Sequence, residues 1–274
     1  MALGLQTNVA SLEVQKNLFR TNAALAKSFN KVSSGYRINS AADDAAGLAI
    51  SESMKAQIRS YVVAERNAND AVSMSQTAEG ALGEMHDVLG RMRELSMQSA
   101  NGTMSSTDRD NIQQEYVALQ AELGRIQQGT KFNGVQLISQ ATNSVTFQVG
   151  LNDDPNDQLK IDFGNMDLTA LQATTVIGVD STAALASLAV IDATVQTVSS
   201  QRANLGAAMN RLEVVTHNIQ TMRLNMSAAN SRIRDTDVAE EMAVLSKNQI
   251  LSQAGVSVLS QANQLPQMAL NLLK

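Results

Sequence analysis

The clearest pattern along the chain is an apolar column that repeats every seven positions near the C-terminal end. Its members are Ile191, Val198, Leu205, Leu212, Ile219, Met226 and Ile233. A seven-residue period keeps one face of an α-helix apolar, so this column predicts one continuous helix over 191–233. The companion column contains Arg202 and Arg223. Arginines on a helix face that would pack against a partner argue against a two-stranded zipper. They favour a helix that meets several neighbours.

Two further stripes predict helices in the first half of the chain. The first has a 3-4-3 spacing from Leu82 to Met92, and the second a 4-3-4-3 spacing from Ile112 to Ile126. The segment 100–108 between them is rich in Gly, Ser and Thr, which is typical of a turn. Thr107 is expected to cap the second of these helices.

Both ends of the chain carry narrower apolar columns with the same period. The remaining positions are mostly Ala, Asn, Gln and Ser, so these terminal helices are marginal alone in water and need a partner. We expect the terminal columns to be assembly seams, disordered in the free chain and ordered on association. The columns consist of Leu5, Leu12 and Phe19 at one end and Val244, Leu251, Val258, Leu265 and Leu272 at the other.

The period changes from helical to alternating after Gln128. The pair Asn133-Gly134 predicts a tight turn, and the stretches 145–150 and 159–164 alternate like strands around an acidic turn. The pattern therefore predicts a small β-hairpin region at about 130–180. The expected fold class is mainly α, with long coiled-coil-like helices from both termini packed together and this hairpin region in the middle of the chain.

Composition and charge narrow the possible classes of protein. Aromatic residues make up only 3 % and cysteine is absent, which suits long thin helices and excludes disulfides and thiolate chemistry. Residues 1–40 carry a net positive charge and residues 235–274 a net negative one, so we expect the two ends to lie side by side. The positive charges are dispersed and lack aromatic partners, which argues against nucleic acid as a partner. The N-terminus does not look like a secretory signal peptide, and no stretch is expected to span a membrane.

Few residues in the chain suggest chemistry. His86 and His217 lack the second histidine that a zinc peptidase helix needs, and no phosphate loop or nucleophile elbow occurs. Asp43 and Asp44 follow Arg37 and could form an acid–base pair. The spacing from Ser40 to Asp43 instead favours a variant of the capping box, with Asp44 adding charge in the first helical turn. We therefore expect no enzyme activity, no cofactor and no metal.

Long blocks of the sequence resemble bacterial flagellins over almost the whole chain. The similar blocks are LQTNVASLEVQKNL, KVSSGYRINSAADDAAGLAISE, ERNANDAVSMSQTAEGAL, RMRELSMQSANGT, GTKFNGVQLI, FQVGLNDDPND, RANLGAAMNRLEVVTHNI, SRIRDTDVAEEMA and LSQANQLPQMALNLL.

The resemblance implies a structural subunit that polymerises into the flagellar filament for swimming motility. Residues 1–41 and 235–274 would form a discontinuous inner-tube domain, and residues 42–234 an outer helical domain. The variable outer domains of the family would be missing. The joint between the layers would contain Arg37, Asp43 and Asp44. The subunit would be secreted through the flagellar export channel without a cleaved signal peptide and would order its terminal helices on polymerising.

The resemblance also implies partners. Arg91, Leu95 and Glu115 match family positions that contact Toll-like receptor 5 in animals, on a surface whose native role would be packing between protofilaments. Other expected partners are further copies of the chain, the hook-associated junction and cap proteins, and an export chaperone at the C-terminal segment.

Other classes of protein compete with the flagellin reading. A hook–filament junction protein of the same superfamily shares the terminal segments, although GTKFNGVQLI and the ending LPQMALNLL favour a true flagellin. A helical signalling module would show a symmetric hairpin without a β insert, together with a membrane span. An enzyme would need a variable-region domain and a metal motif, and the sequence has neither.

Overall fold

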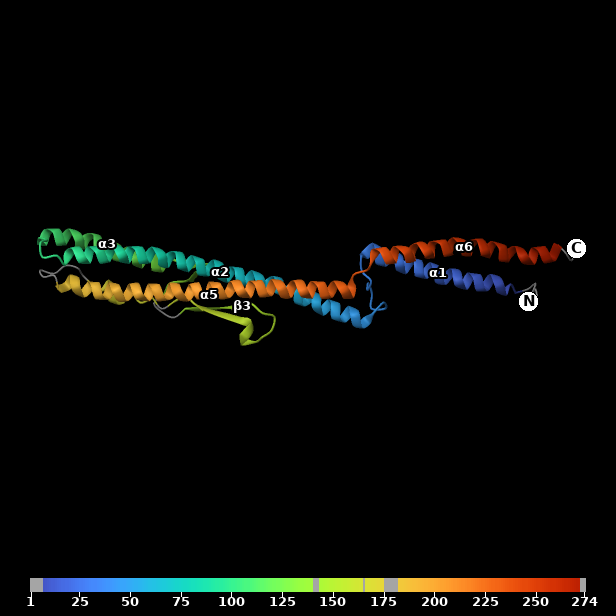
Figure 1. The fold of residues 1–274 in the computed structure, drawn as a ribbon, viewed down its shortest axis with the longest axis horizontal. Helices are drawn as coiled ribbons and strands as arrows, with labels where there is room; N and C mark the ends of the chain where they lie inside the picture. The colour runs from blue at the N-terminus through green and yellow to red at the C-terminus, as the bar shows by residue number, and fades with distance from the viewer. Residues whose placement is uncertain (1–6, 140–142, 165, 175–181, 272–274) are drawn as a thin grey trace. The chain divides into compact units, whose positions relative to one another are not determined.

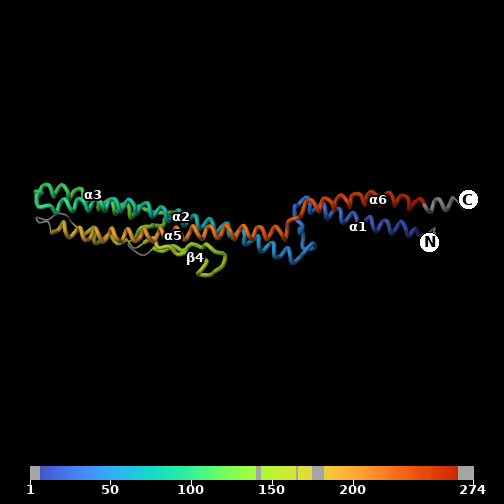
Figure 2. Tube along the Cα trace, viewed as in Figure 1, coloured from blue at the N-terminus to red at the C-terminus, as the bar shows by residue number. Residues whose placement is uncertain are grey.

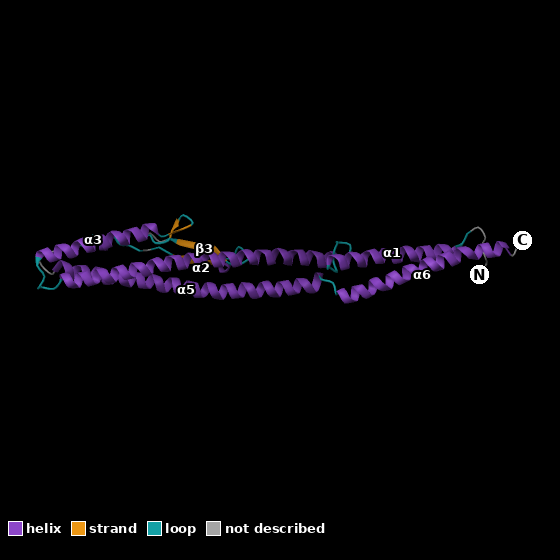
Figure 3. Ribbon diagram, turned by 90° about the horizontal axis from the view of Figure 1, so that it is seen from above, coloured by secondary structure: helices purple, strands orange, loops and turns teal. Residues whose placement is uncertain are grey.

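The computed structural model describes residues 7–139, 143–164, 166–174 and 182–271, with side chains described up to residue 264. The chain is mainly helical, with two short hairpins in its middle (Figures 1 and 3). The fold class predicted from the sequence is confirmed. The helices are α1 (Val9–Ser34), α2 (Ala45–Ser99), α3 (Ser106–Gly129), α4 (Thr169–Gln172), α5 (Thr182–Arg234) and α6 (Val238–Asn271). The strands are β1 (Lys131–Phe132), β2 (Val135–Gln136), β3 (Ser144–Gln148) and β4 (Gln158–Asp162).

The chain divides into two compact units. One unit contains Met1–Ile58 and Leu224–Lys274, and the other contains Arg59–Arg223. This division falls inside α2 and α5, whereas the sequence placed the boundaries at the connectors before α2 and after α5. The domain boundaries at 41/42 and 234/235 therefore stay a prediction.

The unit Arg59–Arg223 is built on the antiparallel packing of α2 and α5. Two ion pairs show the antiparallel match: Glu65 of α2 pairs with Arg223 of α5, and Arg93 of α2 with Asp192 of α5. The predicted apolar column of α5 is buried from Ile191 to Ile219. The prediction of one continuous helix is confirmed, and the helix begins earlier than predicted, at Thr182.

The buried stripe of α2 changes character along the helix. Between residues 64 and 78 it is mainly alanine, and between 82 and 95 it is leucine and methionine. Small side chains let a neighbouring helix approach closely, while larger ones fill the wider space among three helices. The larger residues belong to the same buried cluster as Tyr116 and Leu123 of α3.

The start of α3 differs from the prediction. The N-cap is Ser105, whose hydroxyl accepts from the backbone N–H of Asp108 at 3.2 Å. The Asp108 carboxylate in turn accepts from the Ser105 hydroxyl at 2.7 Å and from the Ser105 backbone at 3.2 Å, and these two hydrogen bonds lower the pKa of Asp108. Thr107 is not the cap, because the helix begins at Ser106 and Thr107 lies inside its first turn.

The two hairpins form where the sequence predicted them. Asn133 and Gly134 have φ angles of 48° and 81°, which suit the two-residue turn that joins β1 to β2. β3 and β4 pair antiparallel, with a register that runs from Ser144 opposite Asp162 to Gln148 opposite Gln158. Side chains of Asn67 in α2 and Gln201 in α5 donate to backbone carbonyls of this hairpin and hold it against the helices.

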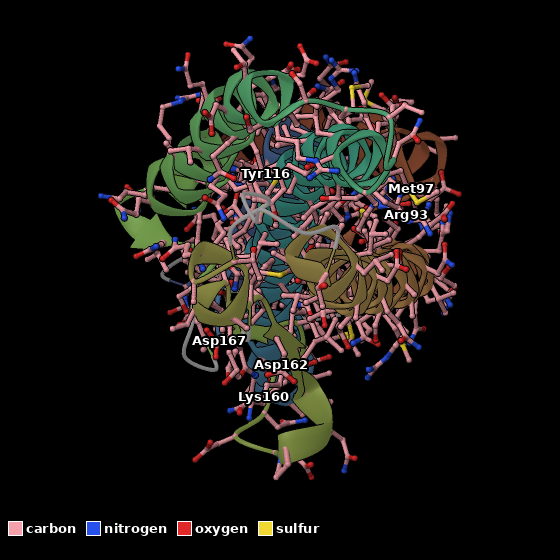
Figure 4. The ribbon with its side chains drawn as sticks, turned by 90° about the vertical axis from the view of Figure 1, so that its left-hand side faces the viewer. Arg93, Met97, Tyr116, Lys160, Asp162 and Asp167 are labelled. Carbon is pink, nitrogen blue, oxygen red and sulfur yellow. The ribbon has the colours of Figure 1, made fainter. Side chains whose placement is uncertain are left out.

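The segment that follows β4 is fastened to α3 by side-chain hydrogen bonds. Gln127 donates to the carbonyl of Met166 at 2.7 Å, and Gln120 donates to the carbonyl of Leu171 at 2.8 Å. The Tyr116 hydroxyl lies 3.0 Å from that of Thr174, and burial raises the pKa of Tyr116. Figure 4 labels Tyr116 inside the bundle, with Arg93 and Met97 near its edge.

One helix in the described part of the chain is long and apolar enough to cross a membrane by length and composition. This helix is α5, in which an 18-residue window has a mean hydropathy of 1.3. The expectation that no stretch reaches this level is wrong by that criterion. The column that makes α5 apolar is the one that packs in the core, and core helices pass the same test.

The core packing of α5 leads to a test of stability in the unpolymerised protein. Leu205 is 0 % exposed, whereas Leu224 on the same helix is 69 % exposed. We expect Leu205→Ala to lower the free energy of unfolding by about 2–5 kcal/mol, because it leaves a cavity. Leu224→Ala should change it by no more than about 0.5 kcal/mol. Urea unfolding followed by circular dichroism measures both, and equal losses would contradict this account of the core.

Candidate functional site

The terminal helices α1 and α6 pair antiparallel through polar side chains (Figure 2). Asn8 donates from its side-chain amide to the carbonyl of Ala262 at 2.8 Å. The Ser252 hydroxyl donates to the Asn22 side-chain oxygen at 3.0 Å, and Lys31 pairs with Glu241 at 3.4 Å. These contacts are spread along both helices, so they fix the register of the pair.

Few apolar side chains are fully buried between the two helices, although Val14, Leu18 and Leu25 are half-buried at the spacing of Ser11 and Ser28. The buried residues on the inner faces are Ser11 and Ser28 of α1 and Leu245 and Ala262 of α6. At Gly255 the helices approach closely, because a Cβ atom there would lie 3.0 Å from the Leu18 side chain. The pair is therefore held by close approach, side-chain hydrogen bonds and partial burial of a narrow apolar stripe.

The apolar columns that the sequence singled out do not lie between α1 and α6. Leu12 and Phe19 are 54 % and 77 % exposed. Their counterparts on α6, Val244, Leu251 and Val258, are also exposed. Leu5, Leu272 and the Leu265 side chain lie outside what the structure describes. The pair thus has an interior that mixes polar and half-buried apolar side chains, and it has apolar outer faces, which we call the outer terminal faces.

The connector between α1 and α2 lies against the connector between α5 and α6. Gly35 ends α1 in the left-handed region, at φ 73°, and its carbonyl accepts from the backbone N–H of Thr236 at 3.0 Å. The backbone N–H of Arg37 donates to the carbonyl of Arg234 at 2.7 Å, and Tyr36 forms an antiparallel bridge with Asp235. The two connectors therefore form a short paired segment.

Two arginines reinforce this segment. Arg37 donates from its guanidinium to the carbonyl of Ile233 at 2.7 Å, where the end of α5 presents its negative dipole. Arg234 lies over the ring of Tyr36, 4.5 Å from the centroid, and pairs with Glu52 of α2. Sequence reasoning found Arg37 but missed Arg234, Tyr36 and Glu52, because their contacts join segments far apart in the chain.

Asp43 and Asp44 have different roles, and only Asp44 acts at the start of the helix as the sequence suggested. The Asp44 carboxylate accepts from the backbone N–H of Gly47 at 2.9 Å, so Asp44 caps α2, which begins at Ala45. The Asp43 carboxylate accepts from the backbone and hydroxyl of Ser40, both at 3.1 Å, and closes the preceding turn. The prediction that Ser40 and Asp43 form the capping box is wrong, because α2 begins only at Ala45 and its first turn is capped by Asp44.

Asp43 also joins this turn to α1. The ammonium group of Lys27 lies 2.8 Å from its carboxylate. The hydrogen bond from Lys27 and the next from the Ser40 backbone hold the pKa of Asp43 far below its usual range. The ion pair with Lys27 accounts for Asp43, and the cap on α2 accounts for Asp44. Neither aspartate therefore needs a catalytic role.

The surface predicted from Arg91, Leu95 and Glu115 is only partly present. Arg91 of α2 donates to Glu115 of α3 at 2.9 Å and to Glu94 at 2.9 Å, and these contacts, first that with Glu115, raise the pKa of Arg91. Leu95 is 1 % exposed and belongs to the core. The expectation that Leu95 lies on this surface is wrong for the described subunit, because the buried face of α2 includes it.

The two histidines show no arrangement for metal binding or catalysis. His217 is exposed and lies 3.9 Å from Glu213 on the same helix. His86 is half-buried on α2, and its Nδ1 atom makes no hydrogen bond. Among the residues that the structure describes, no three His, Cys, Asp or Glu side chains group so as to hold a metal ion.

Together these features define a self-assembling structural protein. It has long paired helices, a terminal pair joined by side-chain hydrogen bonds, and apolar faces exposed on the outside of that pair. The comparisons identify its family. The model for the bacterial flagellin N-terminal helical region matches residues 5–143, and that for the bacterial flagellin C-terminal helical region matches residues 188–273. The chain belongs to the bacterial flagellins. It is a structural subunit of the flagellar filament and not an enzyme.

Individual relatives agree with this assignment. A flagellin of Halalkalibacterium halodurans is 41 % identical over 269 residues, which cover 97 % of this chain and 98 % of that relative. A flagellin of Bacillus subtilis is 42 % identical over 303 residues with the same shares. The crystal structure of Bacillus cereus flagellin matches with a TM-score of 0.51 at 32 % identity, covering 60 % of this chain and 94 % of that one. The compact form without large outer domains fits these relatives.

The start of α2 gives a test of the connector. A Cβ atom on Gly47 would clash with the Asp44 carboxylate and would lie 2.7 Å from the buried side chain of Ile38. We expect Gly47→Ala to destabilise the protein by about 1–3 kcal/mol, because it displaces the cap and Ile38. Gly83→Ala is the matched control, since nothing lies within 4 Å of its Cβ position. That variant should gain about 0.5–1 kcal/mol in thermal unfolding experiments. A neutral Gly47→Ala would contradict the packing described.

The depressed pKa of Asp43 gives a test by pH. A carboxylate whose pKa is lower in the folded state stabilises the fold above its unfolded pKa of about 3.9. This contribution is lost as the pH falls from there through the folded pKa. We therefore expect Asp43→Asn to flatten the fall in thermal midpoint between about pH 5 and pH 2, with Lys27→Gln intermediate. An unchanged pH profile in Asp43→Asn would refute the role of this carboxylate.

Proposed function

We propose that polymerisation completes the fold of the terminal helix pair by burying its outer terminal faces against neighbouring subunits. The observation that carries the proposal is the exposure of Leu12 and Phe19 on a pair that fully buries few apolar side chains. Burying such a side chain contributes about 1.5–3 kcal/mol. Each neighbour can therefore offset part of the entropy that ordering the helices costs.

The same reasoning supports order on association at the chain ends. The inner seam buries only Leu245 and Ala262 among its apolar side chains in the described residues. A helix pair with so little apolar burial is marginal on its own. We infer that the free subunit has loosely ordered ends and that α1 and α6 become firm in the filament.

We also infer that the connector sets how the subunit adapts to filament curvature. Arg37 is bound to the last turn of α5, Asp43 to Lys27, and Asp44 to the first turn of α2. Three separate contacts at one joint restrict its motion, so weakening one of them should shift the preferred filament shape. The family assignment supports further partners, namely the junction and cap proteins and a chaperone at the C-terminal segment. It also supports export without a cleaved signal peptide.

The surface formed by Arg91, Glu94 and Glu115 is proposed to pack between protofilaments and to be recognised by Toll-like receptor 5. Its support is that the three side chains are exposed, charged and held together across α2 and α3. Leu95 is buried beneath it, so it would act by supporting the helix that presents Arg91.

The outer terminal faces give a direct test of assembly. We expect Phe19→Asn to raise the critical concentration for seeded polymerisation roughly 10- to 100-fold, because about 1.5–3 kcal/mol of burial is lost. The conservative Phe19→Leu should stay close to the wild type. Light scattering and electron microscopy measure filament formation, and circular dichroism checks that the monomer is unchanged. Wild-type assembly of Phe19→Asn would sink the proposal.

A further inference from the structure

The methionines of this chain differ sharply in exposure. Met74, Met85, Met92 and Met166 are buried in the core of the unit Arg59–Arg223. Three others are open to solvent in the described subunit. Their exposed fractions are 55 % for Met97, 47 % for Met222 and 43 % for Met242. Oxidants in solution reach the exposed thioethers first, so these three are the candidates for oxidation among the methionines whose side chains the structure describes.

Met242 has a special position among them, because it is the one of the three that lies on the terminal helix pair, exposed on the outside of α6. It follows the exposed Val238 by one helical turn on α6. Its neighbour in sequence, Glu241, is held on the inner side of the pair by Lys31. The Met242 thioether is thus presented outward on the part of the molecule where we propose that neighbouring subunits pack.

We propose that Met242 is a peroxide-sensitive modification site that controls entry of the free subunit into the filament. The sulfur donates an electron pair to one peroxide oxygen, and the O–O bond breaks. The sulfide is oxidised to a sulfoxide, the peroxide is reduced, and the second oxygen leaves as water with both protons.

The sulfoxide changes an apolar side chain into one with a strong hydrogen-bond acceptor. Burying that acceptor without a donor is unfavourable, so oxidised subunits add to the filament end less readily. Once a subunit has been incorporated, its Met242 is covered and protected. The inference rests on the proposed burial of the outer terminal faces.

The test uses full-length protein in two backgrounds. The double variant Met97→Leu/Met222→Leu keeps Met242 as its exposed methionine among the three, and a triple variant adds Met242→Leu. Both are treated with hydrogen peroxide as monomers and then seeded with filament fragments. Trypsin releases residues 235–247, in which Met242 is the only methionine, so mass spectrometry can score its oxidation directly.

Oxidation should raise the critical concentration of the double variant about tenfold, the change that corresponds to about 1.4 kcal/mol. The triple variant should assemble as before, and methionine sulfoxide reductase should restore the double variant. Pre-formed filaments should show protection of the 235–247 peptide. Unchanged assembly of a double variant that carries oxygen on this peptide would overturn the proposal, as would equal losses in both variants. Phe19→Asn separates the two ideas: if it blocks assembly while oxidation does not, only the Met242 inference fails.

Discussion

The packing of α5 against α2 is the interaction on which the unit Arg59–Arg223 depends. A helix of this length gains little from its intrinsic propensity, and its stability comes from burying one stripe along its whole length. The column from Ile191 to Ile219 supplies that stripe on α5. α2 answers with alanines along one part and with leucines and methionines along the next. The hairpin of β3 and β4 covers another side of this core, together with the segment that follows β4 and is hydrogen-bonded to α3.

The terminal pair is built on the opposite plan. Its seam mixes buried serines and a glycine with half-buried leucines and valines, and further apolar residues face outward. Hydrogen bonds between specific side chains define register well but contribute modestly to net stability. Apolar outer faces have the reverse properties, since their burial contributes strongly to association but discriminates little between registers. The division of labour suits a subunit that must pair its own ends correctly before it joins other copies.

Much of this architecture could be predicted from the sequence, because its strongest signals are local. The α5 column and the Asn133-Gly134 turn need no knowledge of distant segments. The helix starts were harder, because Ser40 and Asp43 have the spacing of a cap although the true cap is Asp44, and Ser105 rather than Thr107 begins α3. In both places several neighbouring polar residues could cap the helix, and the backbone conformation determines which of them does.

The sequence was also a poor guide to which face of each helix is buried within the subunit. Periodicity identified Leu12 and Phe19 as one column, but it does not say whether a column meets its own chain or another copy. Leu95 lies four residues from Arg91, a spacing that suggests a shared face, yet α2 buries a stripe wide enough to include it. The contacts of Arg234 with Tyr36 and Glu52 join residues up to about two hundred positions apart, and no local pattern could reveal them.

The polar seam between α1 and α6 has a consequence for the medium in which it must hold. The contacts of Asn8 with Ala262, Ser11 with Asn263 and Asn22 with Ser252 join uncharged groups. Dissolved ions screen charges within about 10 Å at 0.1 M salt, but they leave neutral hydrogen bonds almost untouched. Of the four cross-helix contacts described, only that of Lys31 with Glu241 weakens in brine. The register of the terminal helices is therefore set by groups that are indifferent to ionic strength, from dilute water to seawater.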